Sequence, residues 1–102
     1  MPFGSGAHFL CEAGITAPEV IREVRPEYTP KLMQKQAEDD VLMDIVVGVD
    51  GTVQNARVLR GRYPEMNDQA LKAVRQWLFR PSQLKGAPVV VVAIVYLTFR
   101  LR

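Results

Sequence analysis

The strongest hydrophobic pattern in the chain runs from Pro88 to its end. The β-branched residues that dominate it lose side-chain freedom in a helix and pack well on a pleated sheet. With a period of two, one face is wholly apolar and consists of Val89, Val91, Ala93, Val95, Leu97, Phe99 and Leu101. The opposite face consists of Val90, Val92, Ile94, Tyr96, Thr98, Arg100 and Arg102. We therefore expect one long β-strand over residues 88–102, with its apolar face turned toward a core.

A second pattern predicts a β-hairpin. Two runs rich in β-branched residues, 41–49 and 52–60, flank Asp50-Gly51, a pair that tolerates the positive φ angles of tight turns. A two-residue loop would pair Val47 with Gln54, Ile45 with Ala56, Met43 with Val58 and Asp44 with Arg57. Val53 would then fall on the wrong face relative to Ala56, so a longer loop or a bulge stays open as the alternative.

A first helix is predicted at Thr29-Pro30. Threonine can cap free backbone N–H groups, and proline fits the first helical position because its missing donor would be unpaired there. We expect this helix to run to about Ala37, followed by a solvated acidic turn at residues 38–40. Before it, residues 15–24 read as a short extended segment that ends at Arg25-Pro26.

A second helix is the clearest in the chain. We expect it to begin with Asn67 as the N-cap and to end near Phe79-Arg80, since Pro81 cannot continue it without cost. Its apolar positions follow helical spacing and are Ala70, Leu71, Val74, Trp77 and Leu78. We interpret Trp77 as a core residue.

These elements predict an α+β fold of two layers, in which two helices pack on one face of a three-stranded antiparallel sheet. Residues 17–102 form this single domain, and residues 1–16, which are rich in glycine and lack a period, are expected to be a flexible lead-in. No signal peptide or membrane anchor is visible in the sequence.

Composition and chemistry argue against several function classes. The 13 basic and 11 acidic side chains leave a net charge of only +2, too weak and dispersed to indicate nucleic-acid binding. His8 and Cys11 have the spacing of two metal ligands, but the chain holds no other His or Cys to complete a site. No residues assemble into a nucleophile, phosphate-loop or metal pattern. We therefore expect no enzyme, no metal and no cofactor.

Several motifs together resemble the C-terminal domain of the TonB family, over roughly residues 17–102. They are Arg25-Pro26-Glu27-Tyr28, the strand at 41–47, Asp50-Gly51-Thr52-Val53, the helix from Asn67 to Trp77-Leu78-Phe79-Arg80-Pro81, Lys85-Gly86-Ala87-Pro88-Val89 and Thr98-Phe99-Arg100-Leu101. The resemblance rests on the combined spacing of these motifs.

The resemblance implies an energy transducer of the Gram-negative envelope. Such proteins are anchored in the inner membrane, work with a motor complex resembling ExbB and ExbD, and reach across the periplasm to TonB-dependent outer-membrane transporters. Their C-terminal domain pairs its last strand with a transporter peptide, the TonB box. An edge strand accepts such a peptide by β-augmentation.

The resemblance also implies partner-binding residues. They are Val90, Val92, Ile94, Tyr96 and Thr98 on the last strand, and Arg25, Pro26 and Tyr28 in the family's Q-P-x-Y-P segment. This chain has Arg25 in place of the usual Gln, Thr29 in place of the usual Pro, and Asp40 where Gly is common. In the family this segment lies near the transporter plug, and the first two departures are expected to change that contact. The alternative function is a structural module that self-associates as a homodimer through the same strand.

Overall fold

The computed structural model describes residues 3–4, 6–9 and 12–100. Its main sheet has four strands in the order β1-β8-β3-β4, namely β1 (His8–Phe9), β8 (Val91–Phe99), β3 (Asp39–Val47) and β4 (Val53–Arg60). β8 and β4 lie antiparallel on either side of β3, whereas β1 runs parallel to β8. The predicted antiparallel trio is confirmed, but the predicted sheet is wrong in strand number and in being purely antiparallel.

The added strand comes from the N-terminal segment. β1 has only two residues and pairs with Val91 and Val92. A strand of two residues is too short to show a hydrophobic period in the sequence, and its pairing with β8 is what makes it a strand. The flexibility expected of residues 1–16 stays a prediction, and Cys11 lies outside the described residues.

Two small ribbons extend the main sheet. β2 (Glu19–Arg22) pairs with β5 (Leu78–Arg80), and β6 (Gln83–Leu84) pairs with β7 (Ala87–Pro88). The last long strand therefore begins at Val91 and not at Pro88, which belongs to the β6–β7 hairpin. Residues 101–102, its predicted end, lie outside the described residues.

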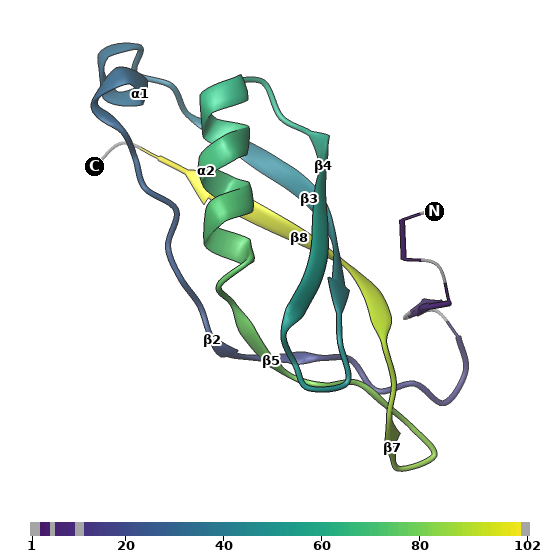
Figure 1. Ribbon diagram of the computed structural model, residues 1–102. Coiled ribbons are helices and arrows are strands. Elements are labelled where there is room, and N and C mark those ends of the chain that lie inside the picture. The colour runs from purple at the N-terminus through teal and green to yellow at the C-terminus, as the bar shows by residue number, and fades with distance from the viewer. Residues whose placement is uncertain (1–2, 5, 10–11, 101–102) are drawn as a thin grey trace.

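Helix α2 (Pro64–Val74) lies against one face of the main sheet, and α1 (Pro30–Gln34) lies near the C-terminal end of β8 (Figure 1). α1 is a single short helix whose Leu32 is fully buried in the core. The expected Thr29 cap is confirmed, since its Oγ1 accepts a bond of 3.3 Å from the Leu32 N–H. The helix ends before Ala37 because Gln36 adopts a left-handed φ of 49°.

α2 differs from its prediction at both ends. It begins at Pro64 after Tyr63, so Asn67 lies inside the helix and is not its N-cap. It ends at Val74, because Leu78–Arg80 pairs with β2 instead of continuing the helical pattern. A strand partner distant in sequence thus overrides the local helical period.

The hairpin between β3 and β4 has the longer loop of the two alternatives. Ile45 pairs with Ala56, Met43 with Val58 and Asp44 with Arg57 as predicted, but Val47 pairs with Val53, and the register shifts after Val46. This bulge restores Val53 to the core face, where it packs against the buried cluster. The two-residue loop is therefore wrong.

The hairpin tip docks closely on β5. Phe79 donates its N–H to the Gly51 carbonyl at 2.8 Å, and a Cβ on Gly51 would lie 1.9 Å from the Phe79 carbonyl oxygen. Gly51 also has a φ of +84°, which side chains disfavour. Asp50 accepts bonds from both the hydroxyl and the N–H of Thr52, and these bonds, the hydroxyl's first, lower the pKa of its carboxyl.

The core lies between α2 and the predicted apolar face of β8. Val91, Ala93, Leu97 and Phe99 are buried, and Val95 is half-buried against them. No helix among the described ranges has the length and apolar character needed to cross a bilayer.

Trp77 confirms its predicted place in the core. It is only 5% exposed, and its Nε1–H donates to the Val24 carbonyl at 2.8 Å. It therefore ties the extended segment before α1 to the end of α2.

Tyr28 fastens the end of the same segment to the turn after α1. Its hydroxyl donates to the Ala37 carbonyl, and its ring centroid lies 6.2 Å from that of Phe99. Burial raises the pKa of the Tyr28 phenol, and the nearby charges of Glu38 and Tyr63 raise it further.

Trp77→Ala is expected to lower the free energy of unfolding by roughly 3–5 kcal/mol, because it removes a buried aromatic side chain and leaves a cavity. Urea denaturation followed by circular dichroism measures the loss. Trp77→Phe is the matched control, which keeps an aromatic ring but loses the donor to Val24, and it should cost less. A Trp77→Ala variant that unfolds like the parent contradicts the core assignment.

Tyr28→Phe is expected to lower the melting temperature, because the Ala37 carbonyl loses its donor. Because the pKa of Tyr28 is raised in the folded protein, this stabilisation is complete below the pKa of the unfolded chain, near 10. It is lost as pH rises through the pKa of the folded protein. The stability gap between parent and variant should therefore be constant at neutral pH and shrink above about pH 10. Tyr96→Phe, at an exposed position, should leave the melting curve unchanged. A gap that grows with alkaline pH rejects the assigned bond.

Candidate functional site: the open edge of strand β8

One edge of β8 is filled and the other is largely open. β3 pairs with all of β8, from Asp39 opposite Phe99 to Val47 opposite Val91. On the other side β1 pairs with Val91 and Val92 alone. Within the part of the chain that the structure describes, no strand pairs with residues 93–99 on that side.

The contact with β1 shows which backbone groups face the open edge. His8 donates its N–H to the Val90 carbonyl at 2.8 Å, so the Val90 carbonyl points to this side. Backbone groups alternate in direction along a strand, so Val92, Ile94, Tyr96 and Thr98 point the same way. Ile94, Tyr96 and Thr98 therefore present N–H and C=O groups that an added strand could bind.

The same residues carry exposed side chains. Ile94 is 64% exposed and Tyr96 is 59% exposed, and Thr98 is also exposed, all on the face of β8 opposite the core. Val90 and Val92 are half-buried, because the N-terminal segment lies against them. Two large apolar side chains thus flank open hydrogen-bonding groups.

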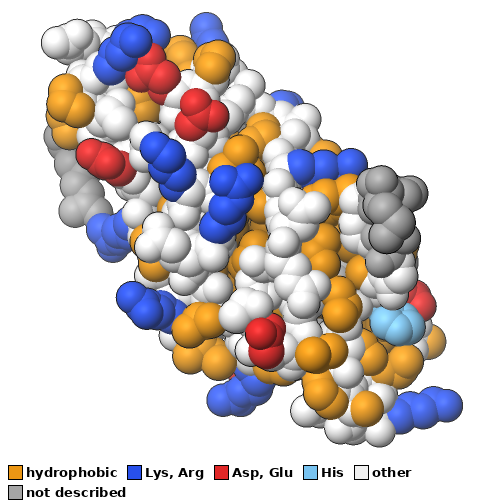
Figure 2. Space-filling model, viewed as in Figure 1, with side chains coloured by type: hydrophobic (Ala, Val, Ile, Leu, Met, Phe, Trp, Pro, Cys, Tyr) orange, Lys and Arg blue, Asp and Glu red, His pale blue; other side chains and the backbone are white. Residues whose placement is uncertain are grey.

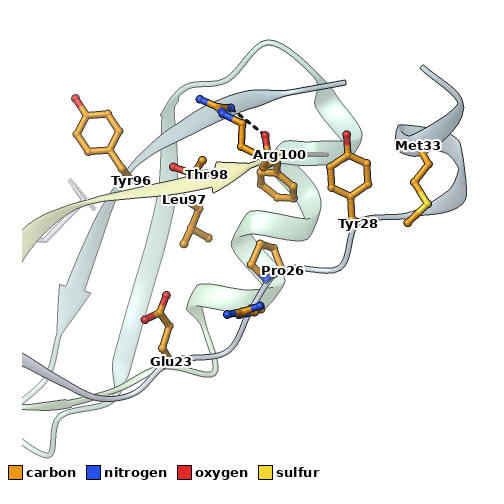
Figure 3. A pocket seen from close by; sticks show the side chains of 10 residues that line it. Glu23, Pro26, Tyr28, Met33, Tyr96, Leu97, Thr98 and Arg100 are labelled. Carbon is orange, nitrogen blue, oxygen red and sulfur yellow. Dashed lines mark hydrogen bonds between the residues drawn. The ribbon is translucent and has the colours of Figure 1, made fainter. Parts of the chain in front are cut away.

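A groove of about 760 Å³ adjoins the C-terminal half of this edge. Its walls come from the segment before α1, from α1 and from the end of β8, and its lining residues are Glu23, Arg25, Pro26, Tyr28, Met33, Tyr96, Leu97, Thr98, Phe99 and Arg100. In Figure 3, Leu97 points toward Glu23 and Pro26, whereas Tyr96 points away from them on the opposite face of β8. The groove therefore lies along the strand edge between these two faces.

The structure brings five of the eight predicted site residues together. Arg25, Pro26 and Tyr28 share the groove with Tyr96 and Thr98. Ile94 lies farther along the same edge, and Val90 and Val92 lie where β1 pairs. The two predicted groups, far apart in sequence, thus meet at one end of β8.

The charged side chains that line the groove are Glu23, Arg25 and Arg100. Arg100 lies 3.2 Å from the Asp40 carboxylate and also donates to the Phe99 carbonyl at 2.9 Å. Arg25 is exposed, and it makes no ion pair with the residues that the structure describes. Beyond the groove, Lys and Arg side chains are scattered over the face seen in Figure 2 and do not gather into one patch.

Sequence reasoning missed half of the groove, namely Glu23, Met33, Leu97, Phe99 and Arg100. Leu97 and Phe99 were assigned to the core, where they are indeed buried, but their edges also line the groove. Met33 is exposed, because a helix of five residues has room for one buried position, Leu32. The alternation of β8 was the one signal that could have indicated Arg100.

The described residues offer no metal centre, since no group of three or more His, Cys, Asp or Glu side chains lies together among them. His8 instead lies 3.2 Å from Glu12 through Nδ1. The pKa of Glu12 is lowered mainly by the Phe9 N–H and then by His8.

Comparison with known proteins gives matches over the part of the chain that contains the groove and β8. The model of the Gram-negative bacterial TonB protein C-terminal family matches residues 24–101. A solved structure, the solution NMR structure of the Pseudomonas aeruginosa TonB C-terminal domain, superposes with a TM-score of 0.58 at 18% identity, covering 92% of this chain and 95% of that one. At this identity the likeness shows the fold alone. A search of curated proteins found no relative.

The family match covers most of the chain and includes both the groove segment and β8. Domains of this family are non-enzymatic parts of energy transducers, are typically periplasmic, and typically bind outer-membrane transporters. This chain belongs to the TonB C-terminal domain family.

Proposed function

We propose that this domain binds the TonB box of an outer-membrane transporter by adding the peptide as a strand to the open edge of β8. The observation that carries the proposal is the open edge at Ile94, Tyr96 and Thr98, whose C-terminal half adjoins the groove. Backbone bonds to these residues supply affinity for an extended peptide of almost any sequence. Exposed Ile94 and Tyr96 add apolar contact on one face of the peptide.

The groove supplies the other face. A peptide strand on this edge turns alternate side chains toward Pro26, Tyr28 and Leu97. Arg100 at this wall is paired with Asp40, whereas Arg25 has no ion pair among the described residues, so the groove favours a peptide with a neutral or acidic side chain beside Arg25. Arg25 thus supplies a positive charge at the position where the family usually has glutamine.

Binding at β8 couples the transporter to the rest of the transducer. We place the domain in the periplasm, as part of a full-length protein anchored in the inner membrane and driven by an ExbB/ExbD-like motor through its N-terminal region. The proton motive force then reaches the transporter as a pull on the paired peptide and powers active uptake.

Tyr96→Ala is expected to weaken binding of a TonB-box peptide by about tenfold, because a large exposed aromatic at the edge is removed. Folding should change little, since Tyr96 faces solvent. The measurement is a titration of ¹⁵N-labelled protein with the peptide, in which the amides of Ile94, Tyr96 and Thr98 should shift. Leu59→Ala is the matched control, an exposed apolar residue on β4 at the opposite edge of the sheet, and it should bind like the parent. Unmoved β8 amides in the parent reject the proposal.

The open edge also favours a second candidate, pairing of β8 with its copy in another chain. Exposed Ile94 and Tyr96 would be covered in such a homodimer, and antiparallel pairing of two identical strands is compatible with two-fold symmetry.

The two candidates predict different behaviour in solution. Peptide binding as the main function predicts a monomer whose mass, measured by analytical ultracentrifugation, does not change with concentration. Self-association predicts a mass that rises toward the dimer, and Tyr96→Ala should reverse that rise. A constant monomer mass excludes the homodimer.

A further inference from the structure

The N-terminal segment lies along the start of β8, on the same side as the proposed peptide. We call its described residues, 3–4 and 6–9, the N-terminal strap. Three separate contacts hold the strap on the sheet, and none of them belongs to the hydrophobic core.

The first contact is backbone pairing. The His8 N–H donates to the Val90 carbonyl at 2.8 Å, and β1 then runs parallel to β8 with His8 opposite Val91 and Phe9 opposite Val92. These two pairs occupy the edge at the beginning of β8 and stop there. The strap therefore uses the same kind of backbone group that the proposed peptide needs.

The second contact is a close approach at Gly4. A Cβ on Gly4 would lie 2.7 Å from Cγ2 of Val92 and 3.7 Å from Cγ2 of Val46, and the φ of Gly4 is +68°. Glycine backbone thus sits directly on the outer face of the sheet. This explains why Val46, which points away from α2, is only 5% exposed.

The third contact is electrostatic. The Arg57 guanidinium lies 4.5 Å from the centre of the Phe3 ring, within the range of a cation–π interaction. Arg57 is itself held by the Asp44 carboxylate at 2.9 Å, and Asp44 is buried. The strap thus ends on a side chain whose position the main sheet already determines.

We propose that the N-terminal strap sets the register of the bound peptide by closing the Val90–Val92 end of the β8 edge. An incoming strand can then pair only from Ile94 to Thr98, and the groove borders this part of the edge at Tyr96 and Thr98. The strap thus determines which peptide residues meet Tyr28 and Arg25. This inference rests on the proposed function, because it assumes that a peptide binds β8.

The register of an added strand needs such a stop. Backbone bonds alone do not distinguish one register from another that is shifted by two residues. The side chains of β8 do not distinguish them either, because its first half presents similar small and β-branched residues. A shift by two residues keeps the peptide's faces but moves every side chain away from its groove contact. A closed end removes these alternatives.

The test compares two changes at one position. His8→Pro removes the N–H that binds the Val90 carbonyl, whereas His8→Ala keeps that N–H and removes only the imidazole paired with Glu12. Gly4→Val is a second route to the same result, because its side chain would collide with Val92. All three changes lie outside the core, so thermal melting should show folded domains.

The first readout needs no peptide. The Val92 amide faces β1, and its hydrogen exchange should be several-fold faster in His8→Pro and Gly4→Val than in the parent and His8→Ala. Equal exchange in all four proteins shows that the strap does not cover the edge and overturns the inference.

The second readout is the footprint of a TonB-box peptide on β8 amides. In the parent and in His8→Ala the shifts should begin at Ile94, and in His8→Pro and Gly4→Val they should extend to Val92 and Val90. A parent footprint that already includes Val90 overturns the inference, since the peptide would then displace the strap. A footprint that stays at residues 94–98 in His8→Pro also overturns it. A parent chain with no β8 response rejects the proposed function and this inference together.

Discussion

The antiparallel pairing of β3 with β8 is the constraint on which the rest of the structure depends. It extends over nine register positions, from Asp39 opposite Phe99 to Val47 opposite Val91. Once it forms, the pleat decides which side chains of β8 are buried and which backbone groups remain available. The core face and the open edge are therefore two results of one pairing. Neither can shift without the other.

Several contacts between distant segments complete the domain around this pair. Trp77 binds the Val24 carbonyl, Tyr28 binds the Ala37 carbonyl, and Phe79 binds the carbonyl of Gly51. The first two determine the path of the segment that forms one wall of the groove. The groove is thus built by side-chain anchors on irregular backbone, placed beside a regular strand.

The fold could be predicted from sequence where a local period was strong. The alternation of β8, the pairs Ile45–Ala56 and Asp44–Arg57 and the Thr29 cap all agree with the structure. The errors have one physical cause, which is that pairing between distant segments overrides local pattern. β5 interrupts what reads as the end of a helix, and β1 has too few residues to show any period.

The candidate site was predictable only in part, for the same reason. Resemblance indicated Arg25, Pro26 and Tyr28, and alternation indicated the exposed side of β8. These two groups share one groove because of the path that the chain takes from β2 to α1. The sequence of one segment alone does not predict that path. The pairing of β1 at the Val90 end of β8 could not be predicted either. It depends on the close packing of Gly4 against Val92, and no local sequence pattern indicates that contact.

The β3–β8 ladder has a mechanical consequence. Its hydrogen bonds run across the strands at alternate register positions, so a load applied along β8 strains all of these bonds at once and breaks none of them singly. A load applied across the strand would instead open the ladder one bond at a time. A peptide paired alongside β8, as proposed, would transmit its tension in the first direction, so the strand with the proposed binding edge is also held in the geometry that best resists being pulled out.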